Sequence, residues 1–227
     1  MRYLFLCLLL LAGCKREPAP EFVDFIFQVP LTLAPARDTV AVGDTLWLTA
    51  DFSDQLQEFY SGQKYQVTPG NFELRALLGL FKLTNPSKDI GSQPAATESF
   101  TFVNQIGSVT RRGATFSGVQ YVYKQGSYQL HVGLIPRARG VFCINFLDGW
   151  LSRDRDDPGP DLSYIELGQT AEGGKRRASF RIIFYRINDG QTNFNLFRQH
   201  CQAASLVYPE PDNINYEQKA TFTFVVK

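Results

Sequence analysis

A strict alternation of apolar and polar residues from Thr45 to Phe52 is the feature that most constrains the fold of this chain. Successive side chains of a β-strand point to opposite faces, so this period of two predicts a strand with one buried and one solvated face. The apolar face carries Leu46, Leu48, Ala50 and Phe52, and the polar face carries Thr45, Trp47, Thr49 and Asp51. We therefore expect the segment to cover a core on one side only.

Similar segments recur along the chain, separated by turn residues such as Gly43-Asp44 and Gly126-Ser127. We predict further strands at 22–29, 72–80, 100–102, 116–123, 128–134, 141–147, 180–187 and 221–226. The segment 72–80 also fits a helix in part, and a strand is preferred there. The segment 128–147 is interpreted as a long hairpin. Many short strands with turns between them, and no internal repeat, predict an all-β protein built as a β-sandwich.

The stretch from Asn193 to Ala204 is the one segment whose residue pattern predicts a helix of more than a turn or so. Phe194, Phe197 and Cys201 recur at the spacing of one helical face. Thr192 or Asn193 has a side chain suited to cap the first turn. One short helix near the C-terminus is therefore expected before the last strand.

The N-terminus has the layout of a secretory signal peptide. A basic start, Met1-Arg2, precedes an apolar run from Tyr3 to Leu11 that is too short to span a bilayer as a helix. The run closes with Leu11-Ala12-Gly13-Cys14, which resembles the lipobox of bacterial lipoproteins. The resemblance implies that Cys14 is acylated and becomes the first residue of the mature chain. The alternative is an ordinary signal peptide in which Cys14 has no role.

We divide the chain into a signal peptide (1–13), a charged, proline-containing tether (14–20) and a β-rich body (21–227), the body being one sandwich or two subdomains. The lipobox resemblance implies a protein that is lipid-anchored in the bacterial cell envelope, at the outer membrane. Lys15 and Glu17 also resemble the surface-export signal of Bacteroidota lipoproteins, from which Arg16 departs. The periplasmic and the surface side of the membrane therefore both stay open.

The segment 38–54 (DTVAVGDTLWLTADFSD) looks like the opening strands of Ig-like sandwich modules in Bacteroidota lipoproteins. The resemblance implies an Ig-like antiparallel β-sandwich with long loops. It implies no activity, because one fold of this class serves many functions.

Charge excludes one class of partner. The chain has 23 basic and 22 acidic residues, and removal of the signal peptide takes Arg2 with it, so the mature chain is balanced. Binding to phosphate backbones needs a net basic face, so nucleic acid is not expected as a partner. Contact with the membrane is expected through the lipid anchor.

Four cysteines have different expected fates. Cys7 leaves with the signal peptide and Cys14 carries the lipid, which leaves Cys143 and Cys201 in the body. An exported chain folds where disulfides are permitted, so these two are a candidate pair. Two separate buried thiols are the alternative, because unpaired cysteine is often buried.

Aspartates crowd the segment that follows the strand at 141–147, and four of them form a candidate calcium site: Asp154, Asp156, Asp157 and Asp161. Calcium needs several oxygen ligands on a flexible loop. Arg153 and Arg155 alternate with these carboxylates and compete for them. We therefore favour a solvated loop that pairs its own charges, and we expect no bound metal or other cofactor.

Catalytic signatures are absent from the sequence. The chain contains no G-x-S-x-G motif. A dyad of Cys143 and His131 requires two strands to pair in the right register, and Cys143 fits a core position better. We expect a protein that is not an enzyme.

Trp47, on the polar face of its strand, and Trp150, at the start of the aspartate-rich segment, are the candidate ligand-binding residues. Aromatic side chains that are not needed in the core can stack on a ligand. The function expected is that of an envelope-anchored, non-catalytic binding or structural module whose partner is an unidentified protein or glycan. The alternative is a glycan-binding accessory lipoprotein of a polysaccharide-uptake system.

Overall fold

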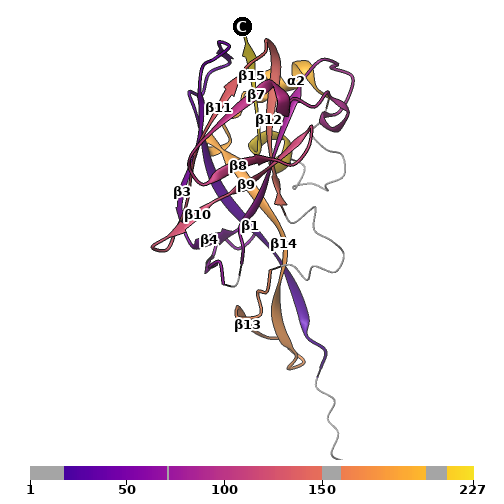
Figure 1. Ribbon diagram of the computed structural model, residues 1–227. Coiled ribbons are helices and arrows are strands. Elements are labelled where there is room, and N and C mark those ends of the chain that lie inside the picture. Colours follow the sequence, from indigo (N-terminus) through magenta and orange to yellow (C-terminus); the bar gives the residue numbers. More distant parts are fainter. Residues whose placement is uncertain (1–17, 71, 150–159, 203–213) are drawn as a thin grey trace, which may run out of the picture.

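The computed structural model describes residues 18–70, 72–149, 160–202 and 214–227, in which two β-sheets pack face to face (Figure 1). The first sheet has the strand order β10-β11-β3-β1-β14-β13. In addition, β4 pairs with β1 and with β5, and β7 pairs with β11. Its strands are β1 (Glu21–Ala34), β3 (Leu46–Ser53), β4 (Gln55–Glu58), β5 (Lys64–Gln66), β7 (Phe100–Ile106), β10 (Val122–Lys124), β11 (Ser127–Pro136), β13 (Glu166–Gln169) and β14 (Lys175–Ile187).

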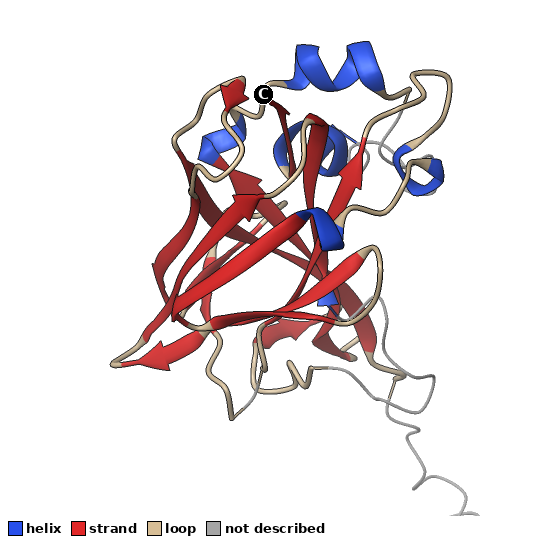
Figure 2. Ribbon diagram, turned by 45° about the horizontal axis from the view of Figure 1, so that its top comes forward, coloured by secondary structure: helices blue, strands red, loops and turns tan. Residues whose placement is uncertain are grey.

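The second sheet has the order β2-β15-β12-β6-β9-β8. Its strands are β2 (Thr39–Val40), β6 (Arg75–Lys82), β8 (Ser108–Arg111), β9 (Phe116–Gln120), β12 (Gly140–Asp148) and β15 (Thr221–Val226). The helical elements are η1 (Ile90–Ser92), η2 (Thr97–Ser99), η4 (Asn188–Gly190), α2 (Phe194–His200) and η5 (Asn215–Lys219). Most of them lie toward the end of the sandwich that carries the C-terminus (Figure 2). No helix among the described residues is long and apolar enough to cross a membrane.

The alternation read from the sequence places the core between the two sheets. In β1, every second residue from Phe25 to Leu33 is buried, and in β3 Leu46 and Leu48 are buried beside them. The same cluster takes Phe142 and other apolar side chains from the second sheet. Each fully buried large apolar side chain stabilises the fold by about 1.5–3 kcal/mol relative to exposure. The predicted all-β sandwich is confirmed, including a strand rather than a helix at β6.

Two strand pairs depart from an antiparallel pattern. β1 runs parallel to β14, from Glu21 opposite Arg176 to Leu31 opposite Ile187, and β15 runs parallel to β2. The β1–β14 ladder skips Arg181, which forms a bulge. The first residues of β1, the first residues of β14 and the strand β13 extend from the end of the body opposite the C-terminus (Figure 1).

The hairpin interpretation of 128–147 is wrong. β11 belongs to the first sheet and pairs with β3, β7 and β10, whereas β12 belongs to the second and pairs with β6 and β15. The physical reason lies in β12, where Phe142 to Phe146 are all buried although they alternate between faces. A strand covered on both faces is most stable in the middle of a sheet, between two partners.

The predicted C-terminal helix is present but shorter. α2 ends at His200, and Cys201 is already extended. Asn193 occupies the N-cap position as expected, but neither expected side chain bonds to the first turn. The Asn193 amide donates to the carbonyl of Thr223 at 3.1 Å, and the Thr192 hydroxyl donates to the carbonyl of Gln218. These side chains instead tie the start of the helix to β15 and η5. Residues 203 and 204 of the predicted helix lie outside the described residues.

Candidate functional site

Two aromatic rings meet on the outer face of the first sheet, Trp47 of β3 and His131 of β11. The two strands are antiparallel neighbours in which Trp47 lies opposite Gly133, so His131 is its diagonal neighbour. The ring centroids are 4.6 Å apart and the planes are inclined by 59°. Both side chains are half-buried, which leaves part of this aromatic pair open to solvent. The sequence-based placement of Trp47 on the polar face of its strand is therefore confirmed.

Gly133 provides the surface against which the Trp47 indole lies. A Cβ atom at this position would lie 3.3 Å from Cζ3 of Trp47 and 3.4 Å from Cβ of Val103 on β7. It would also approach a methyl group of Thr45 to 2.9 Å, closer than such contacts tolerate. The glycine therefore lets the indole settle onto the backbone of β11, a use typical of glycine inside a strand.

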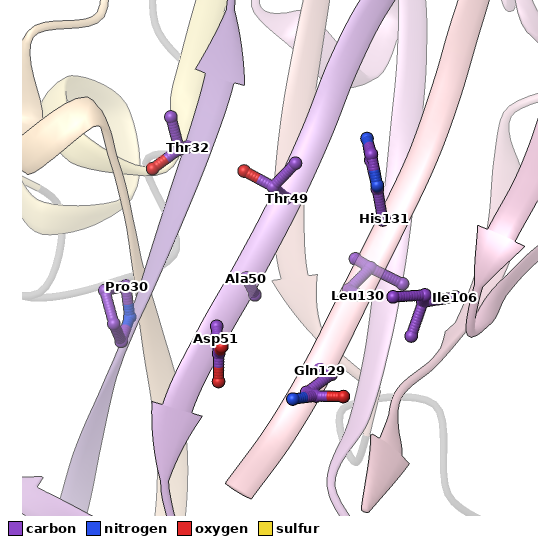
Figure 3. A pocket seen from close by; sticks show the side chains of 9 residues that line it. All are labelled: Pro30, Thr32, Thr49, Ala50, Asp51, Ile106, Gln129, Leu130 and His131. Atoms are coloured by element: carbon purple, nitrogen blue, oxygen red, sulfur yellow. The ribbon is translucent and has the colours of Figure 1, made fainter.

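An open hollow of about 410 Å³ lies on the same sheet face, with His131 among the residues that line it (Figure 3). It is lined by Ala50 and Leu130 and by these outward-facing or neighbouring side chains: Pro30, Thr32, Thr49, Asp51, Ile106, Gln129 and His131. Hydroxyl, amide and carboxylate groups therefore surround an accessible depression, and His131 is the member of the aromatic pair that lines it. The His131 ring contacts the Trp47 indole at the border of the hollow.

A buried carboxylate fixes the sheet edge beyond β11. Asp54 is buried, and its Oδ2 accepts hydrogen bonds from the Tyr123 hydroxyl at 2.8 Å and from Nε2 of Gln66 at 3.2 Å. The hydrogen bond to Asp54 raises the pKa of Tyr123. These contacts join the β10–β11 hairpin to β5, and they hold the strand that carries His131.

The aspartate-rich segment contributes little to the described site. Asp154, Asp156, Asp157 and the second candidate aromatic, Trp150, lie outside the described residues. Asp161 is exposed, and its carboxylate accepts the Ser163 N–H at 2.8 Å, which lowers its pKa. Within the part of the chain that the structure describes, no three His, Cys, Asp or Glu side chains gather in a way that suits a metal ion.

Cys143 and Cys201 lie together but are not joined. Both are buried in a cluster between α2 and the outer face of the second sheet, with Phe81 and Phe197, and neither is part of a disulfide. Burial raises the pKa of Cys143 well above its ordinary value. His131 lies on the outer face of the other sheet, so the Cys143–His131 dyad is not formed. The structure therefore shows buried thiols in place of both the disulfide and the dyad.

Gly133 and the lining of the hollow were not found from the sequence. The lining residues come from four strands, and their spacing along the chain carries no common pattern. A signal existed in β11, where Gly133 stands among the larger outward-facing residues Gln129, His131 and Ile135. A tryptophan on a polar face and a glycine in a neighbouring strand together indicate a ring lying flat on a sheet.

The fold and this site define a β-sandwich with an aromatic pair and an open polar hollow on one sheet face. No protein-family model matches the chain, and a search of curated proteins found no match. Among solved structures, the human F-spondin reeler domain (fragment 2) aligns at 9% identity and a TM-score of 0.29, over 60% of this chain and 84% of that one. A TM-score at this level supports no inference about fold or function.

Proposed function

We propose that this protein is an envelope-anchored lipoprotein whose β-sandwich serves as a non-catalytic binding module. Its binding surface is the outer face of the first sheet around Trp47 and His131. The observation that carries the proposal is the placement of a half-buried aromatic pair beside an open polar hollow. An aromatic pair left at the surface has apolar area available for a ligand.

The anchor in this proposal rests on the sequence Leu11-Ala12-Gly13-Cys14 and is compatible with where the body begins. β1 starts at Glu21, at the end of the molecule opposite the C-terminus (Figure 1). Pro30, at the edge of the hollow, lies about 30 Å further along β1 by the rise of an extended strand. The hollow is therefore remote from the residue at which the strand begins.

Replacement of the lipidated cysteine tests the anchor. Cells producing the Cys14→Ser protein and the unchanged protein are labelled with a fatty-acid probe, and both proteins are purified. We expect label only in the unchanged protein, which should also stay with membranes in high salt, since several acyl chains hold firmly. Equal labelling of the two proteins would overturn the anchor.

A thermal melt tests whether Trp47 belongs to a binding surface. If the indole is kept for a ligand, Trp47→Ala should cost less than about 1.5 kcal/mol of stability, because the ring is only half-buried. A loss of about 3–5 kcal/mol, as for a buried tryptophan, would mean that Trp47 holds the sandwich together. The outer face around Trp47 would then not be a binding surface.

Glycan binding, as in an accessory lipoprotein of a polysaccharide-uptake system, is the second candidate function. The observation that favours it is the combination of an indole with hydroxyl and amide side chains on one sheet face. The C–H faces of a sugar stack on an aromatic ring, while its hydroxyls need hydrogen-bonding partners.

A further inference from the structure

A second hollow adjoins the first on the same sheet face. It measures about 300 Å³ and shares Pro30 with the first hollow. Its remaining lining comes from β1, β3, β4, β5, β14 and η4: Gln28, Phe52, Ser53, Gln55, Leu56, Gln57, Lys64, Arg186 and Asp189. The two hollows together are called the Pro30 trough here.

The Pro30 trough follows the direction of the strands. Along β3, the outward positions Trp47, Thr49, Asp51 and Ser53 succeed one another, and β1 runs antiparallel beside them, with Thr32 opposite Thr49. From Trp47 to Ser53 the strand rises by about 20 Å. The two hollows therefore follow one another along the strands, with His131 in the lining toward one end and Gln55 and Gln57 toward the other. Trp47 lies just beyond the His131 end, in contact with the His131 ring.

Neutral hydrogen-bonding groups dominate the lining. Four glutamines, Gln28, Gln55, Gln57 and Gln129, contribute amides that both donate and accept, and Thr32 and Thr49 contribute hydroxyls. A hydroxyl also both donates and accepts, so a ligand rich in hydroxyls matches this lining at many points.

The charges of the trough are balanced. Asp51 and Asp189 are acidic, Lys64 and Arg186 are basic, and the Arg186 guanidinium lies 3.9 Å from the Asp189 carboxylate. A strongly anionic ligand would meet Asp51 and Asp189, and a strongly cationic one would meet Lys64 and Arg186. The trough therefore favours an uncharged ligand.

We propose that the Pro30 trough binds an uncharged, linear glycan chain, with one sugar stacked on Trp47 and further sugars bonded by the glutamine amides. The proposal rests on the binding function proposed above and names its ligand class. A protein partner fits the trough less well. The backbone groups of a central sheet face are already paired within the sheet, and the core of a protein interface is more apolar than this lining.

The test uses the full-length protein carrying Trp150→Phe, in which Trp47 is the one remaining tryptophan of two. An array of neutral and anionic linear glycans is probed first, and hexasaccharides and disaccharides of each glycan bound are then titrated by Trp47 fluorescence and calorimetry. We expect neutral linear chains to bind and to shift the Trp47 emission. Trp47→Ala should weaken binding, measured by calorimetry, at least about tenfold, the effect of losing one aromatic contact.

A pair of glutamine variants tests the length of the trough. Gln55→Ala, at the end remote from Trp47, should weaken hexasaccharide binding several-fold and leave disaccharide binding unchanged. Gln169→Ala, an exposed glutamine on β13 outside the trough, is the matched control and should change neither. Both substitutions remove exposed side chains, so the fold should be kept.

Three results would overturn the glycan assignment: no neutral linear glycan bound on the array, binding confined to anionic glycans, or unchanged affinity in Trp47→Ala. A purified protein or peptide that binds the trough while no glycan does would overturn it as well. None of these results touches the anchor, which the Cys14→Ser labelling decides. The melt of Trp47→Ala separately decides whether this face is available for binding at all.

Discussion

Asn188 hydrogen-bonds both backbone groups of Leu33. The Leu33 N–H donates to Oδ1 of Asn188 at 2.8 Å, and Nδ2 of Asn188 donates to the Leu33 carbonyl at 3.1 Å. The β1–β14 ladder ends two residues earlier, at Leu31 opposite Ile187. The Asn188 side chain therefore continues the ladder after the backbone of β14 has turned away with a positive φ of 48°.

Asn188→Asp should be less stable than the unchanged protein by about 1–3 kcal/mol, the cost of leaving a polar group without its partner. The aspartate keeps the acceptor for the Leu33 N–H, loses the donor to the carbonyl, and tolerates the same backbone conformation. Urea denaturation measures the difference. Asn188→Gly, which removes both bonds but suits the positive φ, should be at least as destabilised. An aspartate variant of unchanged stability would contradict this role.

Gly107 turns the chain from the first sheet to the second, between β7 and β8. Its φ is +69°, and a Cβ atom there would lie 2.3 Å from the backbone carbonyl oxygen of Gln120. We expect Gly107→Ala to cost more than about 2 kcal/mol, because strain and a backbone clash add. Gly43→Ala is the control, since its φ is +90° but nothing lies near its Cβ. It should cost only about 1 kcal/mol in the same urea titration, and equal costs would contradict the clash.

Glu58 is expected to make the stability of the fold decrease at acid pH. Burial raises the pKa of this carboxyl, but hydrogen bonds from the backbone N–H groups of Ser61 and Tyr60 outweigh burial, so the pKa lies below its ordinary value. The Ser61 bond is 2.7 Å long. Glu58 has a lower pKa in the folded than in the unfolded state. Its carboxylate therefore stabilises the fold above the unfolded-state pKa of about 4.3, and this stabilisation is lost as the pH falls through the folded-state pKa.

Glu58→Gln should therefore lower stability by about 1 kcal/mol at pH 7, and the deficit should shrink below about pH 4. Urea titrations of both proteins across this range measure the effect. Glu172→Gln, an exposed glutamate in the turn before β14, is the control and should leave the curve unchanged. A deficit that persists undiminished at the lowest pH would show that the carboxylate charge is not what matters.

Cys143 and Cys201 should resist alkylation in the folded protein. Both are fully buried, and the raised pKa of Cys143 keeps its thiolate scarce. After denaturation without reductant, peptide mapping by mass spectrometry should find both residues alkylated. Purified protein in which both residues react only after reduction would instead carry the disulfide.

Local pattern was sufficient for the long strands such as β3, and insufficient for the short strands β4, β5 and β13 and for the pairing between strands. The alternation from Leu46 to Ala50 predicted which side chains of β3 are buried, because that property depends only on strand geometry. β11 and β12 belong to different sheets because other elements cover both faces of Phe142 to Phe146. The residues next to this segment in the sequence do not show that it is covered in this way. Trp47 could be predicted as a site residue because a large aromatic residue on a polar strand face stands out in the sequence. Pro30 and Gln129 are part of the site only because strand pairing brings them to it.

The sequence by itself determined the class of this fold, the buried and solvated faces of most strands, and the terminal signature on which the proposed anchor rests. These features are local: side-chain period, turn residues and a short motif. The tertiary structure decided the parallel β1–β14 pair, the sheet change at Gly107, the place of Cys143 and Cys201 beneath α2, and the trough beside Trp47. Each of these depends on contacts between residues distant in sequence, whose register is set by packing the two sheets together rather than by any one segment.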